Sequence, residues 1–181
     1  MISGLRYTRE INKFHSNYSC KKSNPIPENI LRTVVPAAPD AWITALELYG
    51  TMTFAEVASS AIRFAKEGFV MYPLMSDLIA SHESGYRRWD ANKNIYLPND
   101  QPPKVGSLFV QKDLADTLQY IVDEEQSSNG GSIAGLQAAR TAFYRGDIAN
   151  RIVQFHKETD GYWRADDLTE FRVRIEETRK I

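Results

Sequence analysis

Side chains suited to nucleophilic or metal chemistry are scarce in this sequence and lie far apart. The chain holds three histidines and one cysteine, Cys20, so it has no internal disulfide and no cysteine pair for a zinc site. His82 and His156 each fall near the end of an expected helix, where a histidine interacts favourably with the helix dipole. Neither has catalytic partners at a useful spacing, so we interpret both as structural.

Two further stretches resemble ion-binding or phosphate-binding sequences. Asp123, Glu124 and Glu125 form a run of carboxylates, which are ligands that divalent cations prefer. Three consecutive side chains diverge around a helix, however, so we expect a solvated acidic face and assign no metal ligand. Gly130-Gly131 lacks the Lys-Ser that follows in a phosphate-binding loop, so we expect a flexible turn there.

The charge and the hydropathy of the chain argue against nucleic acid and membrane partners. The formal net charge is −1, which gives no general attraction for a polyanion. No apolar run approaches the roughly 20 residues that span a bilayer. The N-terminal stretch turns polar at Arg6, unlike a signal peptide, so the chain as written is expected to be cytoplasmic.

Residues 1–24 are predicted to form a basic, loosely ordered arm. They carry five basic side chains against the single acid Glu10, and chain termini are commonly loose. A nucleic-acid-binding arm is the less favoured alternative, because the rings among these residues show no groove-like pattern.

The elements that would position any site are organised around a pair of helices within residues 40–69. Asp40 is predicted to be the N-cap of the first helix, and Gly50 is predicted to end it in the left-handed conformation. Thr53, with Glu56 three residues later, predicts a capping box at the start of the second helix.

Apolar spacing predicts which faces of the helices are buried. Trp42, Ala45, Leu46 and Tyr49 recur at helical spacing, so we expect them to face the core. Truncating Trp42 to alanine would then cost about 3–5 kcal/mol.

The rest of the chain is predicted to be mainly helical as well. Further helices are expected over residues 73–82, 114–124, 135–144 and 148–155, and a turn-rich surface loop over residues 92–104. A short strand is expected near Val34 and another over Phe171–Ile175, where apolar and polar residues alternate. The predicted fold class is therefore α+β, with most residues in helices.

Several motifs in consistent order resemble the interior of the large subunit of γ-glutamyltransferases. They are VVPAAPDAWITALELYG, the AI…A.EGF of the next helix, a Gly followed by Q..LA.TL, FYxGxIA and a late D-L pair. Their residues after the helix pair are Gly106, Gln111, Leu114, Ala115, Thr117 and Leu118, then Phe143, Tyr144, Gly146, Ile148 and Ala149, and finally Asp167 and Leu168. The resemblance covers residues 25–176, and Ala37 departs from the Gly that the family usually has.

The resemblance implies an N-terminal-nucleophile hydrolase, in which helices flank two stacked sheets in an αββα sandwich. Residues 25–181 would be an incomplete large-subunit-like region of it. The implied reaction moves a γ-glutamyl group from glutathione or a related amide to water or an amino acid, without a cofactor or metal. A freed threonine attacks, and its own α-amine serves as the base. That threonine opens a Thr-Thr-His-like motif that no threonine of this chain matches, so we assign no catalytic residue.

One substrate-binding candidate follows from the resemblance. The family binds the α-carboxylate of its substrate with the arginine of an R-E-x-A-P motif, and a guanidinium suits that two-pronged contact. Arg9-Glu10 matches the first two positions, but the Ala-Pro is missing. On this partial match, Arg9 is the single substrate-binding residue that we assign.

These features favour a truncated or split large-subunit fragment that is inactive alone. Its expected partner is a small-subunit-like chain or a second copy of itself. Enzymes of the resembled family are commonly exported, in contrast to the cytoplasmic expectation. The alternative is a non-catalytic helical interaction module or a remnant.

Overall fold

A computed structural model describes residues 30–177, and the basic arm and Arg9 lie outside them. The chain divides into two compact units, Met1–Val34 and Val35–Ile181. In the first unit the described residues form the 3-10 turn η1, Ile30–Arg32. Thr33 donates from its N–H and its hydroxyl to the Ile30 carbonyl. The strand expected near Val34 is absent from these residues, because the hydrogen bonds turn the chain instead.

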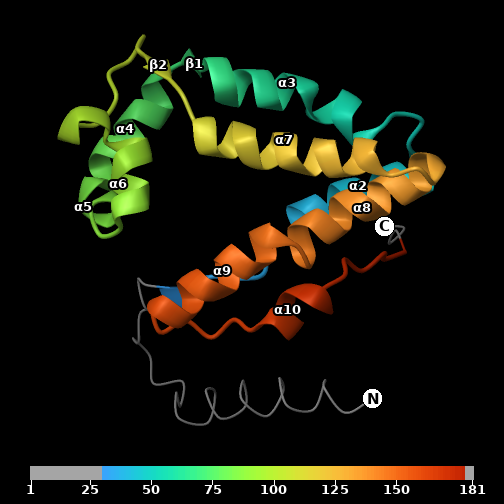
Figure 1. The fold of residues 1–181 in the computed structure, drawn as a ribbon. Coiled ribbons are helices and arrows are strands. Elements are labelled where there is room, and N and C mark those ends of the chain that lie inside the picture. The colour runs from blue at the N-terminus through green and yellow to red at the C-terminus, as the bar shows by residue number, and fades with distance from the viewer. Residues whose placement is uncertain (1–29, 178–181) are drawn as a thin grey trace. The chain divides into compact units, whose positions relative to one another are not determined.

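The second unit is mainly helical, as predicted (Figure 1). Its helices are α2 (Ala38–Tyr49), α3 (Phe54–Glu67), α4 (Pro73–Ser81), α5 (Glu83–Tyr86), α6 (Asp90–Tyr96), the 3-10 helix η2 (Pro98–Asp100), α7 (Lys112–Ser127), α8 (Gly131–Tyr144), α9 (Asp147–Glu158) and α10 (Ala165–Thr169). Within residues 30–177, no helix has the length and apolar content needed to cross a bilayer.

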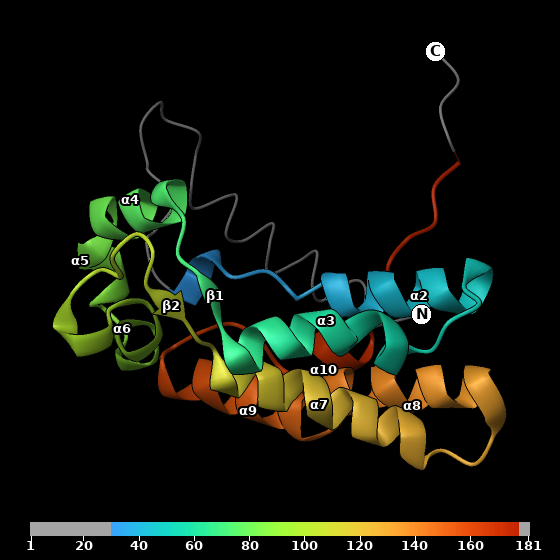
Figure 2. The same cartoon turned by 90° about the horizontal axis from the view of Figure 1, so that it is seen from above.

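Helix α7 lies at the centre of the packing. It contacts α3 and α8, while α8 also contacts α2 and α9, and α10 packs on α9 (Figure 2). These contacts enclose an apolar core drawn from α2, α3, α7 and α8: Ile43, Phe54, Ala58, Ile121, Val122, Leu136 and Ala139. The helix pair expected from the sequence is therefore part of the scaffold, and α7 and α8 complete it.

A second small core holds the segment that contains α4 to α6. Strands β1 (Phe69–Val70) and β2 (Leu108–Phe109) pair antiparallel at its base, with Phe69 opposite Phe109. Phe109 of this pair is buried together with Met71, Ile79 and Leu97.

The loop expected over residues 92–104 is helical in its first part. Helix α6 ends at Tyr96, and the irregular backbone begins only at η2, where Asn99 has φ 57° and Asp100 has φ 65°. Ile95 and Leu97 pack into the second core. Burial of these side chains outweighed the Asn and Pro turn signals on which the loop prediction rested.

Helix α2 starts earlier than predicted and ends differently. Its first residue is Ala38, so Asp40 lies inside the first turn instead of at the N-cap. Gly50 follows the helix with φ −81° and ψ 150°, which is extended backbone and not the predicted left-handed conformation. The N-cap prediction for Asp40 was therefore wrong, whereas Gly50 ends the helix as predicted but in an extended conformation.

The buried face of α2 is also not the predicted one. Trp42 is 53% exposed and Tyr49 is 80% exposed, whereas Asp40 and Ile43 are fully buried. Of the four residues predicted to face the core, Leu46 alone packs against it, and Trp42, Ala45 and Tyr49 lie on the outer face. The inner face instead contains a carboxylate with a buried partner. Trp42→Ala is therefore expected to cost far less than the truncation of a core aromatic residue.

The strand expected over Phe171–Ile175 forms no ladder with another strand among the described residues. The segment follows α10 without regular structure. The N–H of Val173 donates to Oδ2 of Asp40 at 2.7 Å. A side chain of α2 thus provides the acceptor that a neighbouring strand would provide in a sheet.

Candidate functional site

A buried charged network joins α2 to α8. Arg140 Nε lies 2.7 Å from Asp40 Oδ1, and Arg140 Nη2 lies 3.1 Å from Glu47 Oε2. The same guanidinium donates to the Thr44 hydroxyl at 2.8 Å. Asp40 is fully buried and Arg140 almost so. Since either charge alone would be strongly penalised in this environment, each depends on the other for its place in the core.

Tyr144 extends this network to the backbone before α2. Its hydroxyl accepts from the Asp40 N–H at 3.1 Å and donates to the Pro36 carbonyl. The Asp40 N–H belongs to the first turn of α2, whose N–H groups lack partners within the helix. Burial raises the pKa of Tyr144 to about 12, so the hydroxyl remains a proton donor at neutral pH. The phenol is therefore a structural connector.

A second polar cluster caps the N-terminus of α3. Glu125 on α7 accepts from the N–H groups of Phe54 and Ala55, each at 2.7 Å. The Thr53 hydroxyl accepts from the Glu56 N–H at 3.1 Å, and the Glu56 carboxylate accepts from the Thr53 N–H at 2.8 Å. The predicted capping box is confirmed. Glu125 of α7 and the N-cap residue Thr53 thus satisfy the first three N–H groups of α3.

The acidic run at the end of α7 is solvated only in part. Asp123 and Glu124 are exposed as expected, but Glu125 is buried. Helical rotation turns Glu125 towards α3, and the positive end of that helix accommodates a carboxylate. Among residues 30–177, no group of three or more His, Cys, Asp or Glu side chains is arranged to hold a metal ion.

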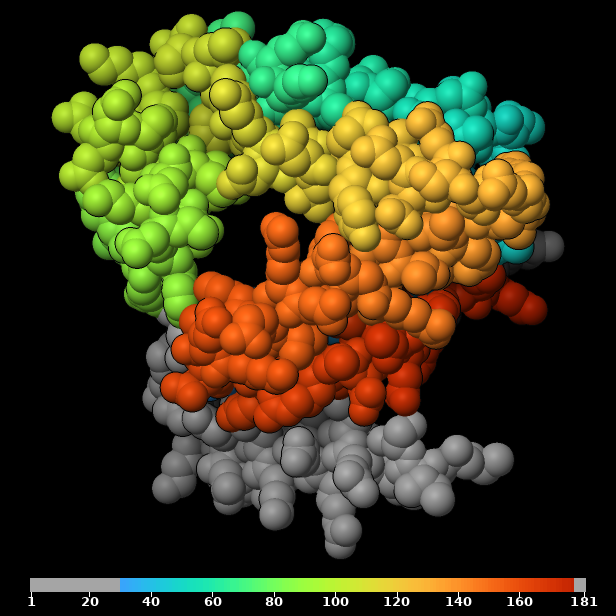
Figure 3. Space-filling model, viewed as in Figure 1, coloured from blue at the N-terminus to red at the C-terminus, as the bar shows by residue number. Residues whose placement is uncertain are grey.

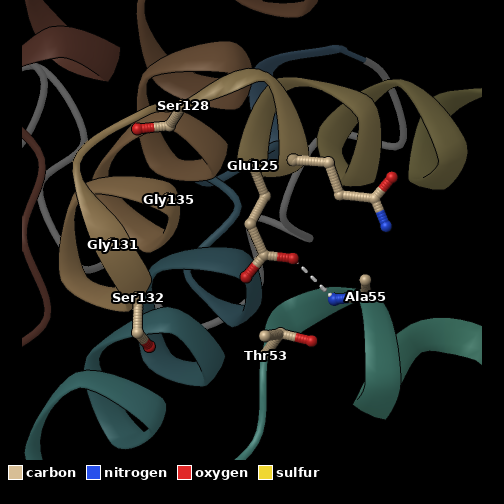
Figure 4. Close-up of a pocket in the computed structure, with 8 residues that line it drawn as sticks. Thr53, Ala55, Glu125, Ser128, Gly131, Ser132 and Gly135 are labelled. Atoms are coloured by element: carbon tan, nitrogen blue, oxygen red, sulfur yellow. Dashed lines mark hydrogen bonds between the residues drawn. The ribbon is translucent and has the colours of Figure 1, made fainter.

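A pocket of about 240 Å³ lies where α3, α7 and α8 meet (Figure 4). It is lined by Thr53, Ala55, Glu125, Gln126, Ser128, Gly131, Ser132 and Gly135. The Glu125 carboxylate points at the Ala55 N–H, so it is not a free base. A Cβ at Gly135 would lie 3.1 Å from Glu125 Cγ, which shows how closely α8 approaches α7. The lining can offer hydroxyl and backbone contacts to a small ligand but holds no nucleophile with a base.

His156 is packed at the joint between α9 and α10. It is buried, and its ring stacks on Trp163 with centroids 4.3 Å apart and planes 8° apart. Burial lowers the pKa of His156, the positive charge of Arg164 lowers it further, and Asp167 opposes them. A Cβ at Gly161 would lie 2.1 Å from the His156 ring, so the turn after α9 requires glycine.

We expect the free energy of unfolding to fall between pH 7 and pH 5. The unfolded histidine titrates near about 6.5. In the folded chain the pKa is lower, so its contribution is present above about 6.5 and is lost as the pH falls towards the folded-state value. Urea unfolding of His156→Gln should show a weaker pH dependence than the parent chain. The control His82→Gln, at an exposed histidine, should keep the dependence of the parent. If the free energy of unfolding depended on pH equally in both variants, the titration of His156 would not be the cause.

The comparisons with known proteins decide the family. The sequence model described as gamma-glutamyltranspeptidase matches residues 10–180. The chain belongs to the gamma-glutamyltranspeptidase family. It is similar to the glutathione hydrolase-like YwrD proenzyme of Bacillus subtilis, with 28% identity over 94% of the chain and 29% of that relative. It is also similar to the acylase ACY 1 proenzyme of Pseudomonas sp. (strain V22), with 28% identity over 79% of the chain and 23% of that relative.

A solved structure agrees with this gamma-glutamyltranspeptidase assignment at the level of fold. The chain superposes on the gamma-glutamyltranspeptidase of Helicobacter pylori with a TM-score of 0.70 and 23% identity, over 84% of the chain and 41% of that protein. The chain therefore spans less than a third of the two proenzymes above and less than half of this structure.

The gamma-glutamyltranspeptidase motifs in this chain hold the fold. Tyr144 of FYxGxIA and Leu168 of the D-L pair are fully buried in one cluster. Gly68 of the EGF motif has φ 90°, and a Cβ there would lie 2.8 Å from Leu108 and Val110. These positions explain why the motifs identify the family without providing any group that attacks a substrate.

The site residue predicted from the sequence is not among the described residues of either buried polar cluster. Arg9 lies outside the described residues, and the family match begins one residue after it. Arg140 was not singled out from the sequence, and Glu125 was considered there only as part of a solvated acidic face. A signal for Arg140 was present: it is the one charged residue of α8 and lies beside Ala139, and a charged residue on a buried face needs a buried partner.

Proposed function

We propose that residues 25–181 form a large-subunit-like region of an enzyme that transfers γ-glutamyl groups from glutathione-like amides, or hydrolyses such amides. The nucleophile would come from a small-subunit-like chain or segment. In this proposal the helices cover one side of an αββα sandwich, and Arg9 is the candidate ligand for the substrate carboxylate. The family match supports the reaction class, and the uncovered apolar face of α2 supports a missing partner layer.

The outer face of α2 is the observation that carries this proposal. Ala41, Trp42, Ala45, Leu48 and Tyr49 are all exposed. An isolated exposed apolar residue is ordinary, but a continuous row of them marks an interaction surface. The opposite face of the same helix buries a charge. This inverted pattern is expected of a helix that is packed on both sides in the complete assembly.

The space beside α7 gives independent support. Figure 3 shows an opening in the molecular surface between α4–α6 and α9, below α7. Leu114 on α7 and Phe155 on α9, two helices that border this opening, are exposed. Protein interiors are normally close-packed. An opening of this kind is the place for side chains from another segment.

We expect the chain alone to be inactive on γ-glutamyl amides. It lacks a threonine in the Thr-Thr-His-like context that the family uses, so no α-amine is placed to activate a hydroxyl. Release of p-nitroaniline from γ-glutamyl-p-nitroanilide should equal the blank, with the glutathione hydrolase of Escherichia coli as the positive control. A rate that follows the purified chain through fractionation would contradict the proposal.

The coding sequence downstream of Ile181 provides the direct test of the proposed function. A Thr-Thr-His-like start there would identify the nucleophile, and joint expression of both parts should release p-nitroaniline. Joint expression without release would reject the proposed enzyme. If no such start is found, the non-catalytic interaction module becomes the better account of the α2 face.

We also expect the purified chain to self-associate. Uncovered apolar patches above roughly a few hundred Å² recruit partners or aggregate. Sedimentation should show species larger than the monomer at high concentration, and Trp42→Gln/Tyr49→Gln should shift them towards the monomer. Ile133→Gln, at an exposed residue on α8, is the control and should change little. A monomer that binds no hydrophobic dye would show that this face needs no cover.

A further inference from the structure

Two non-helical stretches of the second unit meet at the start of α2. Pro36 precedes this helix, and Val173 follows α10 more than a hundred residues later in the chain. The Tyr144 hydroxyl receives the Asp40 N–H and donates to the Pro36 carbonyl. Oδ2 of Asp40 accepts the N–H of Val173 at 2.7 Å. One buried pair of side chains therefore contacts the backbone on both sides of the helical unit.

The polar atoms of Asp40 and Tyr144 are already engaged in contacts within the core. Asp40 and Tyr144 are fully buried, and the second oxygen of Asp40 is occupied by Arg140. The ring of Phe171 stacks on Tyr144 with centroids 5.8 Å apart and planes 17° apart. The outgoing segment is thus held at Phe171 by its ring and at Val173 by its backbone.

We propose that Asp40 is a positioning residue that, with Tyr144, holds the segment before α2 and the segment after α10 together. Its target is the backbone N–H of Val173, which lies outside any helix or strand, and a carboxylate is the strongest acceptor that a side chain offers to such a group. Figure 2 shows the last described residues leaving the helices beside α2.

The biological role of this contact, though not its existence, rests on the proposed function. If a sheet layer completes the family fold, residues 171–177 are where this unit would meet it. Fixing the backbone at Val173 then sets the position and register of the segment that the layer receives. The register of a strand needs such a fixed point, because a shift of one residue exchanges its two faces.

Amide hydrogen exchange in the unmodified chain gives the first test. Arg172 and Arg174 flank Val173 in the same segment. The Val173 amide should exchange at least about tenfold more slowly than these neighbours, since a hydrogen bond to a charged group supports a difference of that size. Equal exchange rates at the three amides would overturn the proposal without any variant being made.

Val173→Pro gives the second test, because it removes the donated N–H and leaves the Asp40–Arg140 pair in place. Spin labels on cysteines at Ala37 and Arg174, with Cys20 replaced by serine, report the distance between the two segments. Both labelled positions are exposed. We expect a narrow distance distribution in the parent and a broad one in Val173→Pro, with the helical content unchanged.

The matched control is Ile175→Pro, two residues further along the same segment. It should keep the narrow distribution, since the hydrogen bond that holds the segment to Asp40 is donated by Val173. A narrow distribution in Val173→Pro, or equal broadening in Ile175→Pro, would overturn the positioning role. Neither measurement uses catalysis or a partner chain, so failure here is distinguishable from failure of the proposed enzyme.

Discussion

Replacing Arg140 with alanine is expected to destabilise the chain by about 3–5 kcal/mol, the cost of leaving a buried charge without its partner. Asp40 would remain fully buried with one oxygen facing the space that the guanidinium filled. The chain must then protonate this carboxylate or admit water between α2 and α8. Urea unfolding followed by circular dichroism at neutral pH measures the loss.

The control for this prediction is Arg151→Ala. Arg151 lies on the exposed side of α9, so its removal should change the free energy of unfolding by no more than about 0.5 kcal/mol. Asp40→Ala/Arg140→Met removes both charges together and should recover part of the loss, because replacing a whole buried pair is cheaper than breaking it. A loss below about 1 kcal/mol in Arg140→Ala would mean that water already solvates the pair.

Helix α2 shows what apolar periodicity can and cannot predict. The spacing of Trp42 and Tyr49 located the helix correctly, because helix formation responds to local sequence. It could not say which side faces the core, since that depends on Arg140 almost a hundred residues away. Apolar spacing on a helix predicts a face that packs against something, and the sequence of one helix does not say which segment packs there.

The hydrogen bonds of the Thr53–Glu56 box and of Val173 differ in the same way, since the first form between neighbours in sequence and the second joins distant residues. The Thr53–Glu56 box was predicted and is present, because both halves of the motif lie within four residues. The strand expected at Val173 needed a neighbouring strand, and the described residues provide a carboxylate instead. The reciprocal Thr53–Glu56 box could therefore be predicted from sequence, whereas the single-residue cap at Asp40 and the distant partner of Val173 could not.

Glu125 is the case in which the sequence pattern pointed away from the structural role. A carboxylate in an acidic run at a helix end resembles a solvated residue, and its neighbours Asp123 and Glu124 are indeed exposed. Only the packing of α3 against α7 reveals that Glu125 caps another helix. No local rule indicates a capping residue that lies 70 positions from the helix it caps.

Glu125→Ala is expected to destabilise the chain by about 2–4 kcal/mol, since two N–H groups of α3 lose their acceptor and each costs about 1–3 kcal/mol when buried and unsatisfied. The Phe54 N–H is buried and should bear most of this cost, whereas the Ala55 N–H is only part-buried. Glu125→Gln keeps one acceptor oxygen and should lose less. Glu124→Ala, one residue earlier and exposed, is the matched control and should stay within about 0.5 kcal/mol of the parent. If Glu125→Ala unfolds at the same urea concentration as Glu124→Ala, water entering the pocket must cap α3 as well as the carboxylate does, and Glu125 would not hold α7 against α3.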